Sequence, residues 1–318
     1  MRLTEIWRAT VPGHTSHTVL ADPGSKSLFV SDGWGVAYPA LRLHRLDPET
    51  GEQLAEIRTR QQHVSALVAA QDSLFVATHS RLLRLRPGDL GPVGHWDKVL
   101  PSDSQQLVAL GDRLIAANWR KPVVGLFEVG TGTSVRLRVG LQPLLLRHGD
   151  GVSVVEGFDG SRRPIDLERG RLLGAEPGPP VTAVAAGTDI WGVAAGEPAD
   201  GGGGAPSTWL KPAADRLLRL SGEGRWEALL AGPGMSVHCD DERGLVWCLV
   251  GPGPSTLVAV SQEYRWSVAS FNAGPGRYWA YFDPTSGLAV AVEAVEAGGG
   301  YRSPQAASTL IGHLVVSD

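Results

Sequence analysis

The sequence predicts an all-β chain: a seven-bladed β-propeller with four-stranded antiparallel blades. Two observations carry this prediction. A short apolar pattern recurs seven times along the 318 residues, and the two ends of the chain look like complementary parts of one blade. The 41 Gly and 22 Pro residues also indicate many turns and little helix.

The repeat consists of apolar runs that each follow a tight turn. Their spacing averages about 45 residues, the size of a four-stranded propeller blade. We name the strands of a blade a, b, c and d from the axis outward, and the runs are the b strands. Around the first two runs, alternating segments predict a strand c at 41–46, a strand d at 54–57 and a strand a at 64–69. The third residues of the seven runs are Phe29, Phe75, Ile115, Ser153, Trp191, Trp247 and Ala289.

The last repeat has strands a, b and c but no strand d. The N-terminal segment 3–6 resembles the outer strand 54–57, so we expect it to complete the last blade and close the ring. Residues 1–318 then form a single propeller domain. The blades are expected at approximately 14–60, 61–101, 102–140, 141–179, 180–232, 233–273, and 274–318 plus 1–13.

The segment 47–54, Asp-Pro-Glu-Thr-Gly-Glu-Gln-Leu, resembles the turn of the PQQ-like/YVTN group of propeller repeats. This resemblance implies the fold and nothing more. Leu54 stands where quinone-binding dehydrogenase repeats place a tryptophan, so no PQQ cofactor is expected. The GH…WD marks of WD40 repeats are missing.

The net charge, the apolar runs and the motifs of the sequence exclude several classes of partner and cofactor. A net charge of −4 argues against nucleic acid, because neutralising phosphates requires a basic face. No run approaches the ~20 apolar residues of a membrane span and no signal-peptide core is present, so we expect a soluble, cytoplasmic protein without a membrane partner. No glycine cluster opens a helix after a strand, so no nucleotide is expected. Cys239 and Cys248, in one expected hairpin, are interpreted as free thiols.

The face that carries the b–c and d–a loops, which we name the top face, is the expected binding face. Three long b–c segments are expected there, at about 33–39, 196–214 and 297–307, whereas the turns of the other face are nearly all minimal. Insertions in repeat proteins usually map to the binding face. The alternative is that these loops are merely tolerated.

Four of the nine histidines fall in one sector of the top face: His14, His17, His63 and His79. Converging neutral imidazoles commonly hold Zn, Cu or Fe, and three of them with an open position would make a catalytic site. These residues are therefore the candidate ligands of a divalent transition metal. The alternative is that they are hydrogen-bonding groups at a wet channel mouth.

Aromatic and arginine side chains gather on the same face, which suits a flat or anionic organic ligand or a peptide, although a solvated rim would look similar. Glu293 and Asp32 are the candidate general bases. Conventional catalytic motifs such as GxSxG and HExxH are absent, so the sequence leaves enzymatic activity open. The candidate substrate-binding residues are Trp34, Trp119, Arg120, Trp209, Arg277, Tyr301 and Arg302.

Two functions follow from this pattern. In the first, the top face binds a small organic molecule or a short peptide, and a histidine-bound metal assists a lyase, cyclase or isomerase-type step; the streptogramin lyases are similar in fold only. In the second, a non-catalytic propeller presents the top face to a partner protein, with Trp34, Trp209 and Tyr301 as anchors. A narrow polar funnel favours the first function, and a broad apolar plateau favours the second.

Overall fold

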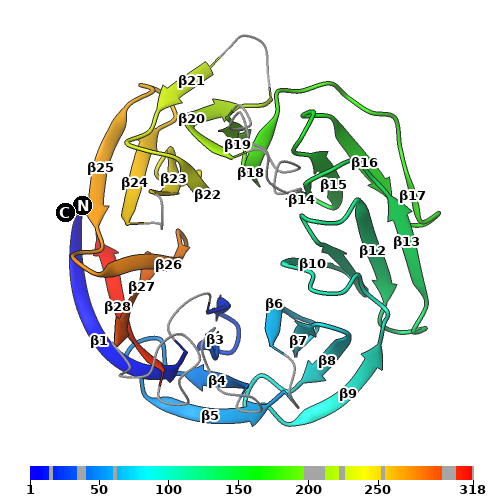
Figure 1. Cartoon of the computed structure of the whole chain (residues 1–318), viewed down its shortest axis with the longest axis horizontal. Helices are drawn as coiled ribbons and strands as arrows, with labels where there is room; N and C mark the ends of the chain where they lie inside the picture. Colours follow the sequence, from blue (N-terminus) through cyan, green and yellow to red (C-terminus); the bar gives the residue numbers. More distant parts are fainter. Residues whose placement is uncertain are drawn as a thin grey trace, which may run out of the picture. The chain divides into compact units, whose positions relative to one another are not determined.

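The computed structural model describes residues 1–13, 17–33, 41–59, 63–196, 212–221, 226–251, 255–295 and 306–316. In these residues the regular structure consists of β-strands, arranged in seven four-stranded sheets (Figure 1). The chain divides into two compact units, residues 1–112 with 273–318 and residues 113–272. None of the described residues forms a helix long and apolar enough to cross a membrane.

Each sheet is a sequential antiparallel meander except the last, which takes its fourth strand from the N-terminus. The first two sheets are Val19–Asp22 (β2), Ser27–Ser31 (β3), Arg42–Leu46 (β4), Gln53–Arg58 (β5), and Val64–Ala70 (β6), Ser73–Thr78 (β7), Arg81–Leu85 (β8), Pro92–Asp97 (β9). The third and fourth are Gln106–Leu110 (β10), Arg113–Ala117 (β11), Val123–Glu128 (β12), Ser134–Arg138 (β13), and Pro143–His148 (β14), Gly151–Glu156 (β15), Arg162–Asp166 (β16), Arg171–Leu172 (β17).

The remaining three sheets follow the same plan. The fifth and sixth are Val181–Ala186 (β18), Ile190–Ala195 (β19), Ala213–Arg219 (β20), Trp226–Leu229 (β21), and Gly234–Asp240 (β22), Leu245–Val250 (β23), Thr256–Ser261 (β24), Ser267–Asn272 (β25). The seventh is Arg277–Asp283 (β26), Leu288–Val295 (β27), Ala307–Val316 (β28) and Arg2–Pro12 (β1). The seven strands expected from the repeat as b strands are β3, β7, β11, β15, β19, β23 and β27, as predicted.

Burial explains why the b strands read as continuous apolar runs. All residues of β7 are buried, whereas the outer strand β5 alternates between exposed and half-buried positions. A strand that is covered on both faces needs apolar residues throughout, and a strand at the outside needs them on one face only. The distinction between inner and outer strands drawn from the sequence is therefore confirmed.

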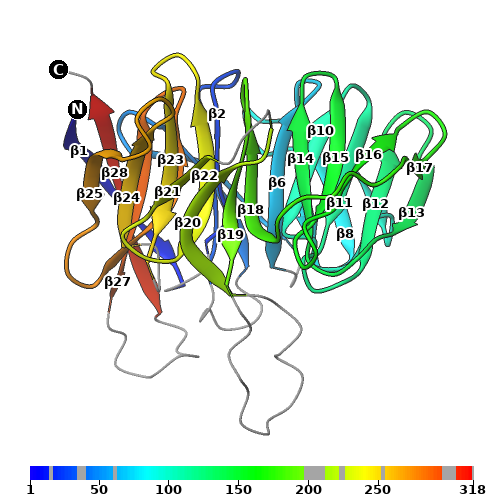
Figure 2. The ribbon, with the colours of Figure 1, turned by 90° about the horizontal axis from the view of Figure 1, so that it is seen from above.

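The N-terminal strand completes the last sheet, as predicted. β1 runs antiparallel to β28 from Arg2↔Val316 to Pro12↔Ala307, and the two strands lie side by side in Figures 1 and 2. A register shift between Glu5 and Trp7 marks a bulge. The pairing covers an edge of β28 that would otherwise be open to other chains.

Trp7 ties this last sheet to the first one. Its side chain is buried in an apolar cluster with residues of β3 and β27, including Leu28 and Leu288. Its indole Nε1 donates a hydrogen bond of 2.8 Å to the carbonyl oxygen of Pro48, in the β4–β5 turn. One buried aromatic side chain thus joins the two sheets by packing and by a directed bond.

In the second unit, Trp226 of the fifth sheet contacts another tryptophan of its own sheet and bonds to the sixth sheet. Trp191 on β19 and Trp226 on β21 meet edge to face, with ring centroids 4.6 Å apart. The indole of Trp226 donates to the carbonyl oxygen of Gln262 at 3.0 Å. Cys239 and Cys248 are free thiols, as the sequence predicted.

Candidate functional site

The b–c and d–a connections lie at one end of each sheet, which we name the top end. Several residues that the sequence places there lie outside the described residues, as do most of the three long loops. Of the candidate ligands and binding residues, these are His14, Trp34, Trp209, Tyr301 and Arg302.

The structure brings His63 and His79 to one carboxylate, that of Asp103. His63 directly precedes β6, His79 lies in the β7–β8 turn, and Asp103 lies in the β9–β10 connection, so all three belong to the top end. The Nδ1 atom of His79 lies 2.9 Å from both carboxylate oxygens, and the Nε2 atom of His63 lies 3.8 Å from Oδ1. The side chain of His79 is 61% exposed, so the pair opens to solvent.

His17 belongs to the same neighbourhood but is buried. Its Nδ1 atom lies 2.9 Å from the carbonyl oxygen of Ser31. The hydroxyl of Thr18 donates to the carbonyl oxygen of Val64 at 3.1 Å, so the residues that follow His17 and His63 are in contact. His17 and His63 thus lie just before the first strands of neighbouring sheets, β2 and β6. Their positions are not equivalent in register, because Leu20 pairs with Phe29 and Val68 with Phe75, and the two histidines precede these partners by different numbers of residues.

A metal site needs three or more donors that converge. Within the part of the chain that the structure describes, no group of three or more His, Cys, Asp or Glu side chains could hold a metal ion. The side chain of His79 turns Nδ1 towards Asp103, which occupies that nitrogen as a hydrogen-bonding group. His14, the fourth candidate ligand, lies outside the described residues, so the metal site stays a prediction.

Asp32, one of the two candidate bases, is buried against His44. The Nε2 atom of His44 lies 2.7 Å from Asp32 Oδ1, and its Nδ1 atom lies 2.9 Å from Gln53 Oε1. The other oxygen of Asp32, Oδ2, is buried without a hydrogen-bond partner. Burial raises the pKa of Asp32, and the hydrogen bond from His44 opposes this effect.

Glu293, the other candidate base, is paired with Arg277, a candidate substrate-binding residue. The two face each other across β26 and β27, with Arg277 Nη2 and Nε each 3.1 Å from Glu293 Oε2. Arg8 on β1 approaches the same oxygen at 3.8 Å and bonds Glu5 at 2.7 Å. The structure thus brings a predicted base and a predicted anion-binding group together as an ion pair.

In the second unit, Trp119 and Arg120 lie in the β11–β12 connection, at its top end. The guanidinium carbon of Arg120 lies 4.7 Å from the centroid of the Trp119 ring. The backbone N–H of Arg120 donates to Asn118 Oδ1 at 2.8 Å, which fixes the turn. This stacked pair presents a cation on an aromatic face.

Two functional-site residues were not singled out by the sequence. Asp103 lies in a loop without any periodic pattern; the polar stretch 102–104 before a strand was its only signal. His44 was placed on strand c and given no role. His44 pairs with Val30 on β3. Asp32 lies two residues after Val30 and therefore on the same face, so the antiparallel register predicts that His44 and Asp32 are diagonal neighbours.

Comparison with known proteins finds similarity in fold but not in sequence. No protein-family model matches the sequence, and no curated protein matches it. Among solved structures, the Neurospora crassa Pan2 WD40 domain is similar with a TM-score of 0.64 and 9% identity, over 98% of this chain and 95% of that chain. The dihydro-heme d1 dehydrogenase NirN in complex with DHE is similar with a TM-score of 0.56 and 12% identity, over 89% of this chain and 62% of that chain. At these identities the likeness shows the fold alone: the chain is a seven-bladed β-propeller.

Proposed function

We propose that the protein binds a small organic molecule or a short peptide at the top end of its second sheet, with His63 and His79 as the contacting groups. The observation that carries this proposal is the meeting of both imidazoles on the Asp103 carboxylate. The three residues come from three different connections of one end, where a repeat protein usually places its binding surface.

The geometry also suits proton transfer. With Nδ1 of His79 donating to Asp103, the neutral ring keeps its acceptor lone pair on Nε2. A carboxylate that orients an imidazole in this way is the arrangement used by histidine general bases. His79 is therefore a better candidate base for a lyase, cyclase or isomerase-type step than Glu293, which is ion-paired, or Asp32, which is buried.

The test is a binding screen with organic fragments and short peptides, followed by ligand-observed NMR on variants. We expect His79→Ala and His63→Ala each to weaken a ligand of this site by about tenfold, the value of one hydrogen bond of about 1.4 kcal/mol. His95→Ala, which removes an exposed histidine of the outer strand β9, is the matched control. Ligands that bind both site variants as tightly as the parent protein would exclude the proposal.

We propose separately that the candidate histidines bind a divalent transition metal. His63 and His79 supply two of its four candidate ligands, with His17 and His14 as the others. Metal analysis of protein purified without a histidine tag tests it. A content below about a tenth of an equivalent, with no uptake of Zn, Cu or Fe on reconstitution, would remove the metal.

The propeller also suits a scaffold for protein partners, which is the alternative function. In that case the Trp209→Ala variant loses a partner in pull-downs while the two histidine variants retain it. A cytoplasmic location and the absence of nucleic-acid and membrane partners stay predictions from the sequence.

A further inference from the structure

A cavity lies at the other end of the first unit, between the sheet β2–β5 and the sheet formed by β26–β28 and β1. It has a volume of about 590 Å³ and opens at the turns that join strands a to b and c to d. This volume is in the range of small-molecule sites. A site here goes beyond the proposed function, because it involves none of the residues of the top end.

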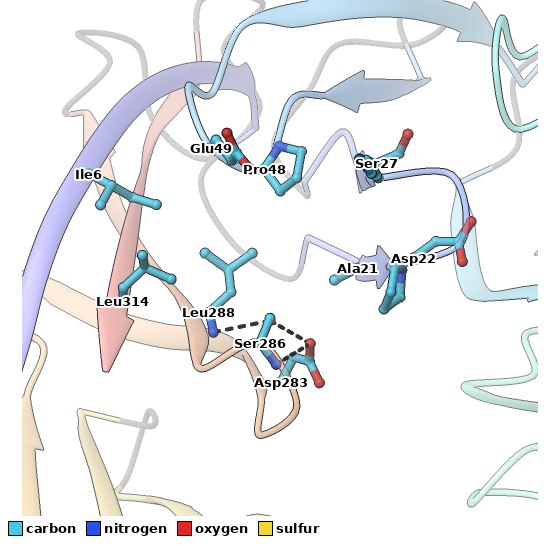
Figure 3. A pocket seen from close by; sticks show the side chains of 12 residues that line it. Ile6, Ala21, Asp22, Ser27, Pro48, Glu49, Asp283, Ser286, Leu288 and Leu314 are labelled. Atoms are coloured by element: carbon cyan, nitrogen blue, oxygen red, sulfur yellow. Dashed lines mark hydrogen bonds between the residues drawn. The ribbon is translucent and has the colours of Figure 1, made fainter. Parts of the chain in front are cut away.

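The inner wall of this cavity is aliphatic. Ile6, Leu288 and Leu314 face it from the last sheet, and Ala21 faces it from the first (Figure 3). Leu288 belongs to the apolar cluster that contains Trp7, and the other three side chains pack against that cluster. An apolar ligand group that enters the cavity therefore leaves water for a hydrocarbon surface.

The rim is built from three turns that share the sequence Asp-Pro-x-Ser/Thr, at 22–25, 47–50 and 283–286. In each turn the aspartate accepts hydrogen bonds from the two backbone N–H groups that lie two and three residues later. Such Asx turns fix the local backbone. The rim is thus set before any ligand arrives, which lowers the entropy cost of binding.

Two hydrogen bonds also hold the walls together. The backbone N–H of Ala21 donates to the hydroxyl oxygen of Tyr281 at 3.1 Å, and the indole of Trp7 donates to Pro48. Each bond joins one sheet to the other. The distance between the two walls is therefore restrained at two points.

The rim of the cavity carries a net negative charge. Asp22, Glu49 and Asp283 line the cavity together with one cation, Lys26, which leaves two net negative charges beside an aliphatic wall. Glu49 and Lys26 are exposed. We propose that this cavity binds an aliphatic cation, a hydrocarbon chain that ends in an ammonium or guanidinium group, supplied either by a small amine or by a Lys or Arg side chain of a peptide.

The first test compares probes of equal length and opposite charge by isothermal titration calorimetry and saturation-transfer NMR. We expect n-hexylammonium to bind at least about tenfold more tightly than hexanoate, and the difference to shrink at high salt. Equal binding of the two probes would overturn the proposal. The second arm uses a tetrapeptide that contains Leu and Lys, together with its acetyl-lysine form. If the peptide binds more tightly than hexylammonium, the bound cation comes from a protein segment. If it binds more weakly, the bound cation is a small amine.

Variants separate the wall from the rim. Ala21→Leu fills the cavity and should reduce hexylammonium binding by at least about tenfold. Glu49→Gln should weaken it by about threefold and Lys26→Gln should strengthen it by about threefold, while Glu52→Gln, an exposed acid just beyond the same turn, leaves it unchanged. Because Glu49 and Lys26 are exposed, these two variants keep the test decisive if Ala21→Leu fails to fold. Shifts of the same sign for both would contradict the proposal, and His79→Ala, which belongs to the top end, should have no effect.

Discussion

His44 and Asp32 form a buried pair within the first sheet. His44 Nε2 lies 2.7 Å from Asp32 Oδ1, and the two side chains are 3% and 1% exposed. The pair shares a face of the sheet with Leu28, Val30 and Leu46, which pack against Trp7. A charged or strongly polar pair in such surroundings is favourable only while both members are present.

The first prediction concerns this pair. His44→Leu leaves the Asp32 carboxyl buried with neither oxygen paired to a side chain, and should lower the free energy of unfolding by about 3 kcal/mol. The double variant Asp32→Ala/His44→Leu removes both polar groups and should cost less than the sum of the single changes. Urea unfolding of the parent and the three variants at pH 7 measures the coupling. Additive costs would show that the two side chains do not stabilise one another.

The positions of the strands followed from the sequence because they depend on local information. Alternation and turn residues fix a strand within a few residues, and the repeat supplied seven independent copies of the same pattern. Even the completion of the last sheet by β1 could be predicted, since the fourth strand was missing from the last repeat. The register then placed His63 and His79 at one end.

The Asp103 contact and the aliphatic cavity could not be predicted from the sequence, because both depend on contacts between segments that lie far apart in the chain. Asp103 reaches the two histidines from the β9–β10 connection. The sequence of this connection has no alternating pattern, so the contact could not be predicted from it. The aliphatic cavity is lined by residues from two sheets and from the turns of both. Because nearly all turns of that end are minimal, no site was predicted there, although the Asp-Pro-x-Ser/Thr pattern repeats at 22, 47 and 283.

The second prediction concerns His313 on β28. Its ring meets Trp279 edge to face at 5.4 Å, and burial lowers its pKa; Glu5 opposes this effect, while Arg277 and Arg8 add to it. The unfolded chain therefore takes up a proton near pH 6.5 that the folded protein does not. The free energy of unfolding should fall as the pH falls from about 6.5 towards the lower, folded-state pKa.

His313→Phe keeps a ring beside Trp279 and removes the titration. Urea unfolding at several pH values between 5 and 7 should show a smaller loss of stability for this variant than for the parent. His95→Phe, at an exposed position of β9, should keep the slope of the parent. An unchanged slope in His313→Phe would refute the assignment.

The third prediction concerns the two cysteines. Burial raises the pKa of the thiols of Cys239 and Cys248 to about 12, and nearby aspartates add to the effect at Cys239. At pH 8 the thiolate fraction is then about a thousandfold lower than for a thiol of pKa 9, so both should react very slowly with a disulfide reagent in the folded protein. Titration in 6 M guanidinium should release two rapid equivalents. Fast reaction of either thiol in native buffer would contradict this.

The last prediction concerns how Trp7 packs against Gly312 within the last sheet. Gly312 pairs with Trp7 across β28 and β1, and a Cβ atom at Gly312 would overlap the indole ring. Gly312→Ala should therefore lower the free energy of unfolding by about 2 kcal/mol, because a buried ring fixed by its bond to Pro48 has no room to move. In a Trp7→Ala background the same change should cost little, since the space is then empty, although Trp7→Ala itself costs about 4 kcal/mol. The double-mutant cycle isolates the overlap: equal costs of Gly312→Ala in both backgrounds would mean that backbone preference, and not the indole, requires glycine here.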